Sequence, residues 1–283
     1  MLPYGNTRQP TETKRYIANT HKTPPPNPTE QQKREWNRLN RGSRKHVLDW
    51  IAQDTFLADL RARLPAGVTV SDAAWHMPRQ GNTDEAQLRG PTPDHLPANL
   101  WKQLADWWLV HASGATLPVW DLAVAADIDG RPGFVLVEAK ANSPELGRGG
   151  KRLPEGSNAS KANHKRISDA IAEANRAWST QVSGLALSAD AHYQLANRLA
   201  WVWKLADLGV PVVFAYLGFY GDDADVLTGV FKDAADWRNA FTAYAKEVGA
   251  DRLFDRRYEF GHTPVHVLLW SKKVIEFSRP ILR

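Results

Sequence analysis

An Asp-Gly pair between two apolar runs constrains the fold of this chain more than any other feature. Residues 120–128 and 131–140 are largely apolar and lie on either side of Asp129 and Gly130. Asp-Gly in this setting is a strong short-range signal for a two-residue hairpin turn. The sequence therefore predicts a β-hairpin in which the residues on either side of the turn face each other.

This register predicts a charged cluster at the open end of the hairpin. Asp121 falls opposite Glu138, and Lys140 lies two residues further along on the same face, at the end of an apolar strip. A shift of one residue would instead place the two acids on opposite faces. Two facing carboxylates repel each other unless a cation lies between them, so the cluster needs an explanation.

A divalent metal held by Asp121 and Glu138 would relieve this repulsion. Such a metal can hold a scissile phosphate and lower the pKa of a bound water. Lys140 would then position or activate that water and stabilise the developing phosphorane charge. The chain has no Cys, which excludes disulfides, thiolate zinc sites and cysteine nucleophiles. Carboxylate ligands favour Mg²⁺ or Mn²⁺.

At these residues the chain resembles a known family. Pro118-Val-Trp-Asp121, a strand, a turn and Glu138-Ala-Lys140 resemble the PD-(D/E)XK motif of restriction-endonuclease-like nucleases, with the Pro three residues before the Asp instead of adjacent. The resemblance covers about residues 100–220. It implies an α/β (α+β) fold with a restriction-endonuclease-like core, a central mixed β-sheet flanked by helices.

The resemblance also implies further site residues. In that family a Gln, Lys or Tyr on the helix after the motif strand often reaches the active site, and Gln194 resembles that residue. Many members recruit another acid from the first core helix. The candidates for this acid are Asp49, Asp54 and Asp106, although each also fits a solvated helix charge. Glu145 follows the motif strand and is a candidate supporting group.

Basic residues concentrate in two segments. Residues 1–46 carry ten Lys or Arg against three acids, a net charge of +7 in a chain whose total is +5. Residues 147–166 carry six Lys or Arg against one Glu and leave directly from the Lys140 strand. A basic Gly-rich loop beside such a site suits a nucleic-acid backbone. The alternatives are a solvated or subunit-binding tail for the first segment and a surface loop for the second. Arg198 lies one helical turn after Gln194 and could also meet a phosphate. The expected phosphate contacts are Arg148, Lys151, Arg152, Lys161, Lys165, Arg166 and Arg198.

The rest of the chain predicts one domain. Residues 1–43 form a basic, Pro-rich arm, which we expect to be flexible, and residues 44–283 form a single nuclease-like domain. Hydrophobic periodicity predicts helices near 44–63, 100–110, 160–178, 190–208 and 233–248, and strands near 67–70, 211–217 and 265–270. His262 and His266 are four residues apart, but the intervening Thr263-Pro264 argues against a helix that would bring them together, so they do not indicate a zinc site. No segment approaches the length of a membrane span, which favours a cytoplasmic protein.

These features predict a Mg²⁺-dependent hydrolase of phosphodiester bonds, an endonuclease with DNA favoured over RNA, acting in restriction, repair or defence. One such site per chain suggests a homodimer for double-strand cutting. The alternatives are a catalytically silent module of the same fold that binds nucleic acid or protein, and a different metal-dependent hydrolase built on a similar hairpin. The twelve Trp are mainly expected in the core.

Overall fold

A computed structural model describes residues 29, 41–79, 81–90, 95–111, 117–222 and 228–274. Their fold is mixed α/β, with a seven-stranded mixed sheet in the order β1-β3-β4-β5-β7-β6, and β2 pairs with β3 beside this path. The strands are β1 Val68–Thr69, β2 His76–Met77, β3 Leu122–Ile128, β4 Arg131–Lys140, β5 Val212–Tyr220, β6 Arg256–Phe260 and β7 Thr263–Lys273. The helices are α3 Gly42–Ile51, α4 Phe56–Arg61, α5 Ala98–Trp108, α6 Asn158–Ser179, α7 Tyr193–Asp207 and α8 Ala234–Lys246, with short 3₁₀ turns at Ser143–Glu145 and Asp251–Leu253.

The β3–β4 hairpin has the predicted register. Ile128 pairs with Arg131 and Leu122 pairs with Val137, which confirms the two-residue turn. Asp129 and Gly130 have φ values of 53° and 77°. Both values lie in the left-handed region, as a two-residue hairpin turn of type I′ requires. Asp127 also stabilises the turn, because its Oδ1 accepts a hydrogen bond from the Gly130 N–H at 2.8 Å.

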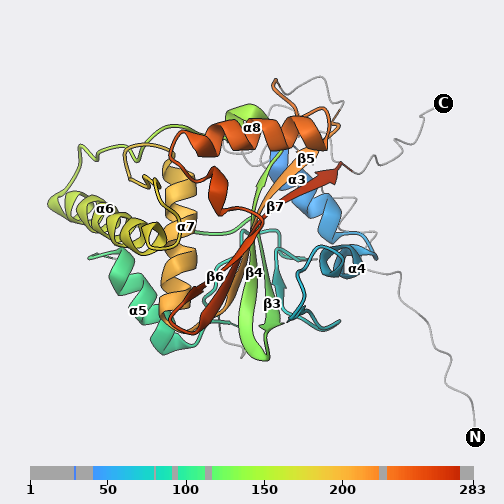
Figure 1. The fold of residues 1–283 in the computed structure, drawn as a ribbon, viewed down its shortest axis with the longest axis horizontal. Coiled ribbons are helices and arrows are strands. Elements are labelled where there is room, and N and C mark those ends of the chain that lie inside the picture. The colour runs from blue at the N-terminus through green and yellow to red at the C-terminus, as the bar shows by residue number, and fades with distance from the viewer. Residues whose placement is uncertain are drawn as a thin grey trace, which may run out of the picture.

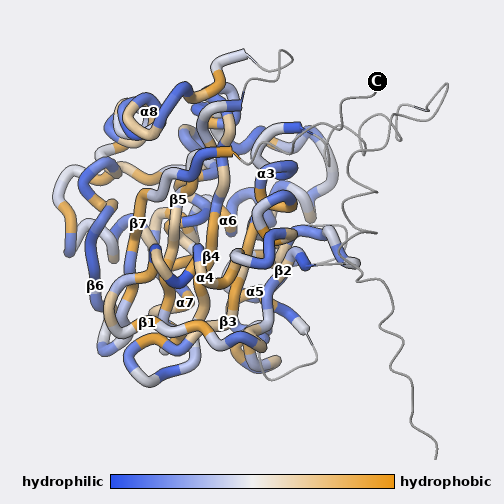
Figure 2. The backbone as a smooth tube through the Cα atoms, turned by 90° about the vertical axis from the view of Figure 1, so that its right-hand side faces the viewer, coloured by the Kyte–Doolittle hydropathy of each residue, from blue (hydrophilic) through white to orange (hydrophobic). Residues whose placement is uncertain are grey.

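Helices cover both faces of the sheet (Figure 1). Helices α5, α6, α7 and α8 contribute to a large core on one face, while α3 and α4 pack on the other. Figure 2 shows the hydrophobic strands running through the middle of the molecule between these layers. Strand β4 pairs in parallel with β5, and β5 pairs in parallel with β7. The strand that carries Glu138 and Lys140 is therefore central and buried on both faces.

Most predicted elements are present with small changes at their ends. The Gly67–Val70 segment contains β1, and Asp233 caps α8 by accepting hydrogen bonds from the N–H groups of Ala235 and Asp236 at 2.8 Å. The strand predicted at 211–217 extends to Tyr220 as β5. The strand predicted near 265–270 spans Thr263–Lys273.

One expectation was wrong, and two strands, β2 and β6, were missed. The single helix predicted over 44–63 is two helices, because residues 52–55 form a turn that redirects α4, whose Phe56 and Leu60 join the same core as α3. Strand β6 was not predicted. It lies at the edge of the sheet, and only Tyr258 among its five residues is fully buried, so it lacks a hydrophobic pattern.

The predicted flexible arm, residues 1–43, lies almost entirely outside the described residues, which begin continuously at Arg41. Among the described residues, no helix is long and apolar enough to span a membrane.

Candidate active site

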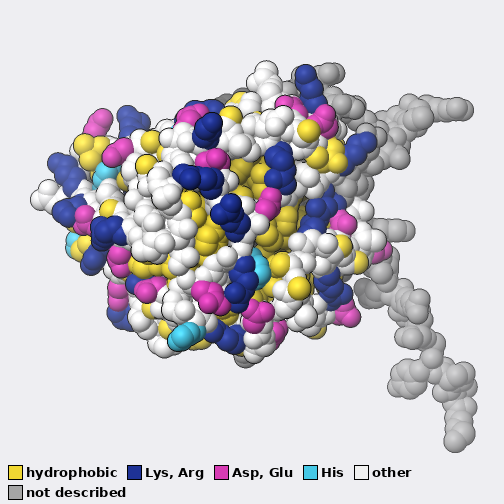
Figure 3. All heavy atoms as spheres, viewed as in Figure 1, with side chains coloured by type: hydrophobic (Ala, Val, Ile, Leu, Met, Phe, Trp, Pro, Cys, Tyr) yellow, Lys and Arg dark blue, Asp and Glu magenta, His cyan; other side chains and the backbone are white. Residues whose placement is uncertain are grey.

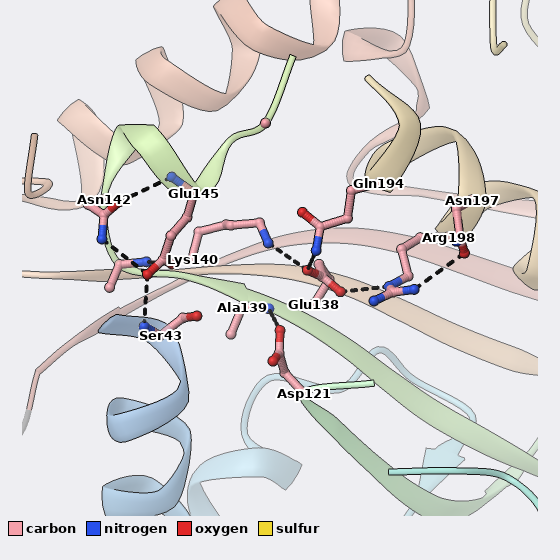
Figure 4. A network of polar contacts seen from close by, with 12 residues as sticks. Ser43, Asp121, Glu138, Ala139, Lys140, Asn142, Glu145, Gln194, Asn197 and Arg198 are labelled. Carbon is pink, nitrogen blue, oxygen red and sulfur yellow. Dashed lines mark hydrogen bonds and ion pairs between the residues drawn. The ribbon is translucent and has the colours of Figure 1, made fainter. Parts of the chain in front are cut away.

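The hairpin brings Asp121, Glu138 and Lys140 together at the end of β4 (Figure 4). Asp121 lies just before β3, and its Oδ2 accepts a hydrogen bond from the Ala139 N–H at 2.8 Å. Lys140 Nζ lies 2.5 Å from Glu138 Oε1. Ala123 and Leu136 pair with each other on the same face, closer to the turn, and both belong to the larger core. The charged side chains therefore end an apolar strip, as the sequence predicted.

Glu138 is the centre of the cluster. Its side chain is only 1% exposed. Its Oε1 accepts hydrogen bonds from Lys140 and, at 2.6 Å, from Gln194 Nε2. Its Oε2 accepts a hydrogen bond from Arg198 Nε at 2.6 Å. Both carboxylate oxygens are thus engaged by donors on β4 and α7.

The two carboxylates have opposite pKa shifts. Burial, followed by the negative charge of Glu138, raises the pKa of Asp121 to about 7. Burial also opposes ionisation of Glu138, but Arg198 and Lys140 outweigh it and hold the pKa of Glu138 below its usual value. Glu138 therefore carries the negative charge of the pair near neutral pH, while Asp121 is poised to gain or lose a proton.

Helix α7 supplies Gln194 and Arg198 one turn apart. Its first residues are tied to the basic loop, since the N–H groups of His192 and Tyr193 donate to the carbonyls of Arg148 and Gly149 at 3.0 and 3.1 Å. These bonds fix the start of the helix relative to the loop that follows β4. The sequence predicted a Gly-rich loop here, and backbone hydrogen bonds anchor this part of it.

The structure separates the expected phosphate contacts into groups. Arg198 is 8% exposed and lies inside the cluster. Lys151 is partly buried, with its Nζ 5.0 Å from the centre of the Tyr193 ring, and burial lowers its pKa. Arg148 is exposed and pairs with Glu247 at 2.7 Å. These residues lie at or near the first turns of α7.

The remaining four cations, Arg152, Lys161, Lys165 and Arg166, are exposed and lie further along the chain, on the loop and on α6. Figure 1 shows that α6 begins at its outer end, away from the sheet. Lys165 Nζ also pairs with Asp169 at 2.7 Å. On the face shown in Figure 3, Lys and Arg side chains are interleaved with Asp and Glu, so the basic residues there form no single continuous patch.

Three neighbours of the cluster were not identified from the sequence. Trp120 is fully buried, with its ring centre 5.0 Å from the Arg198 guanidinium. Tyr216 pairs with Glu138 across β4 and β5, and its ring centre lies 5.7 Å from Lys140 Nζ. Asn197 accepts a hydrogen bond from Arg198 Nη1 at 3.3 Å. Trp120 is adjacent to Asp121 and Asn197 is adjacent to Arg198 in the sequence, whereas the position of Tyr216 depends on the pairing of distant strands.

The three candidate helix acids do not join the cluster. Asp49 is on α3, which packs on the opposite face of the sheet, and it is 4% exposed and paired with Lys45 instead of solvated. Asp54 is exposed in the turn after α3. Asp106 is exposed on α5 and pairs with Lys102 at 2.5 Å.

Glu145 supports the end of β4. Its Oε2 accepts a hydrogen bond from the Ala141 N–H at 2.8 Å, and its Oε1 accepts bonds from the Ser43 N–H and Asn142 Nδ2 at 3.2 and 3.1 Å. It thereby joins the residue after Lys140 to the start of α3. Within the part of the chain that the structure describes, no group of three or more His, Cys, Asp or Glu side chains is arranged to hold a metal. Asp121 and Glu138 are the acidic side chains that the cluster offers to a cation.

Comparisons of the chain with protein-family models, with curated proteins and with solved structures found no match.

Proposed function

We propose that this chain is a metal-dependent nuclease with a restriction-endonuclease-like core, acting on nucleic acid and preferentially on DNA. The observation that carries the proposal is the convergence of Asp121, Glu138, Lys140 and Gln194 at the end of one hairpin. Carboxylates with perturbed pKa values, such as Asp121 and Glu138, are typical of functional sites. The resemblance of the Asp121 and Glu138-Ala-Lys140 segments to the PD-(D/E)XK motif supports the same assignment.

The donor set fits Mg²⁺ or Mn²⁺. Burial and, after it, the negative charge of Glu138 raise the pKa of Asp121, and a cation would relieve the repulsion between the two carboxylates. Mg²⁺ keeps several waters and needs only one or two protein carboxylates, so Asp121 and Glu138 suffice as ligands. When bound, such an ion supplies Lewis acidity toward the scissile phosphodiester.

The chain's own residues have distinct roles in this proposal. The Lys140 ammonium group positions the attacking water and stabilises negative charge in the transition state. Gln194 orients the Glu138 carboxylate through its 2.6 Å hydrogen bond. Lys151 and Arg148, at the start of α7, grip the phosphate backbone. A homodimer would supply two such sites for cutting both strands.

A second candidate is a catalytically silent module that binds nucleic acid or a protein partner. It is favoured by one observation: Arg198 and Lys140 already engage both oxygens of Glu138, and these three side chains are at most 9% exposed. In that case the buried ion pairs would be a structural feature of the core.

A cleavage assay separates the two candidates. The purified chain is incubated with plasmid DNA, linear duplex DNA, single-stranded DNA and RNA, with Mg²⁺ or Mn²⁺ and with EDTA. We expect metal-dependent cleavage, strongest on DNA, that disappears in EDTA. The Glu138→Gln variant, purified in parallel, controls for contaminating nucleases and should not cut. Nucleic-acid binding without cleavage of any substrate would support the silent module and contradict the nuclease.

A further inference from the structure

When both of its carboxylates are ionised, the charged cluster has no net charge without a metal. It contains two carboxylates, Asp121 and Glu138, and two cations, Lys140 and Arg198. Glu138, Lys140 and Arg198 are 1%, 4% and 8% exposed, so water screens these charges poorly. In many metal sites clustered acids leave a negative charge for the ion to neutralise, but here the protein provides its own positive charges.

Arg198 is held in place on several sides. Its Nε donates to Glu138 Oε2 at 2.6 Å, and its Nη1 donates to Asn197 Oδ1 at 3.3 Å. Its guanidinium group lies 5.0 Å from the centre of the buried Trp120 ring. An Arg that is buried and stacked in this way is unsuited to reach an exposed nucleic-acid backbone. Its geometry instead places its positive charge beside the carboxylate of Glu138, which is a proposed metal ligand.

We propose that Arg198 is an internal counter-cation that makes the divalent metal and an anionic phosphodiester bind together. This inference rests on the proposed nuclease function. A divalent ion added alone to a neutral buried cluster leaves two uncompensated positive charges, which is unfavourable at low dielectric. A phosphodiester brings negative charge to the same place and removes that penalty. By linkage, each ligand then raises the affinity for the other by the same factor.

The test measures Mn²⁺ affinity by electron paramagnetic resonance of the free ion, with and without a DNA oligonucleotide that carries phosphorothioate linkages. For the wild-type chain we expect the oligonucleotide to raise Mn²⁺ affinity about 5–150-fold, the usual range of coupling between two sites. Arg198→Gln should bind Mn²⁺ alone more tightly than wild type by a factor in about the same range, with little further gain from the oligonucleotide. Arg198→Lys keeps the charge and should keep the coupling.

Two controls complete the experiment. Asp121→Ala removes a proposed metal ligand and reports the Mn²⁺ that the oligonucleotide binds by itself. Arg176→Gln removes an exposed Arg from α6 and should behave as wild type. Circular dichroism checks that each variant is folded. If Arg198→Gln does not fold, the wild-type comparison with and without the oligonucleotide still tests whether the two ligands are coupled.

Wild-type Mn²⁺ affinity that is equal with and without the oligonucleotide would overturn the inference. So would equal Mn²⁺ affinities of folded Arg198→Gln and wild type. If the wild-type chain still cleaves DNA with Mg²⁺ in either case, only the role of Arg198 is wrong. If it neither binds Mn²⁺ under any condition nor cleaves, the proposed nuclease function fails as well.

Discussion

On strand β4, the side chains of Val137 and Ala139 point to one face of the sheet, and those of Leu136, Glu138 and Lys140 point to the other. The first face packs against α3 and α4 in a core made of apolar side chains. The second face continues a larger apolar core but ends in buried charges. Burying an ion costs several kcal/mol even after the surrounding protein relaxes. We therefore expect substitutions on the first face to change mainly stability, and substitutions at the charged end of the second face to change mainly the proposed activity.

The largest effect should follow from removing a charge on the cluster face. Lys140→Ala should lower the cleavage rate by a factor on the order of 10²–10⁴, the range for a positioned proton-transfer or charge-stabilising group. The fold should survive, and metal binding should persist or tighten because a competing cation is gone. Asp121→Ala should lose metal binding and cleavage together. Single-turnover cleavage and Mn²⁺ titration measure both. Wild-type cleavage by a folded Lys140→Ala protein would show that Lys140 is a bystander.

A truncation on the apolar face should have the reverse effect. Leu217 on β5 is fully buried in the core that faces α3 and α4. Leu217→Ala should lower the free energy of unfolding by about 2–5 kcal/mol, because it removes apolar contacts and leaves a cavity. Urea denaturation measures this change, and the folded fraction should cleave at the wild-type rate. Loss of cleavage in a fully folded Leu217→Ala protein would mean that the two faces are not independent.

The pH dependence of stability should distinguish the two carboxylates of the cluster. In the folded chain the pKa of Asp121 is about 7, above its ordinary value of 3.8. Folding therefore favours the protonated form of Asp121. Its contribution to stability is fully present below about pH 4 and is lost as the pH rises toward about 7. The pKa of Glu138 is lowered, so its contribution is present above its ordinary value of 4.5 and is lost as the pH falls.

Urea denaturation in EDTA between about pH 4 and about pH 8 measures this dependence. Asp121→Asn should lose the decline in stability that the wild-type chain shows as Asp121 ionises. Lys165→Gln, a charge change on the surface of α6, should keep the wild-type profile. If Asp121→Asn shows the same pH profile as the wild-type chain, the ionisation of Asp121 does not affect the free energy of unfolding.

The smallest effect concerns the cations around the cluster. Lys151 lies beside Tyr193 at the start of α7, whereas Lys165 lies on α6 and pairs with Asp169. If the nucleic-acid backbone passes the cluster, Lys151→Gln should reduce the slope of log affinity against log salt by about 0.9 on duplex DNA. Lys165→Gln should leave the slope unchanged. Fluorescence anisotropy over a range of salt concentrations measures both slopes. A reduced slope for Lys165→Gln and an unchanged slope for Lys151→Gln would mean that the nucleic acid runs along α6 instead.

The sequence predicted the parts of the fold that depend on short-range rules. The Asp129-Gly130 turn fixes the hairpin register, and this register alone places Asp121, Glu138 and Lys140 together. Gln194 was identified only through the family resemblance. Its contact with Glu138 depends on how α7 packs against β4, which local patterns do not encode.

Other features left no readable signal. Tyr216 stands beside Glu138 because of the parallel register between β4 and β5, which are separated by two helices. Strand β6 is a short edge strand in which one of five side chains is buried, which is too little apolar character for a strand pattern to be read from the sequence. The turn at residues 52–55 interrupts a helical pattern that continues through it, so periodicity joined α3 and α4 into one helix.

If the proposed function is correct, Asp121 and Glu138 share a divalent metal at the end of the hairpin. Anomalous scattering of Mn²⁺ in a crystal of the chain grown with a phosphorothioate DNA duplex would locate this metal. We expect an anomalous peak within about 2.0–2.5 Å of carboxylate oxygens from both residues, with a phosphate oxygen of the DNA as a further ligand. A peak at other residues, or a fully occupied DNA complex with no peak at Asp121 and Glu138, would contradict it.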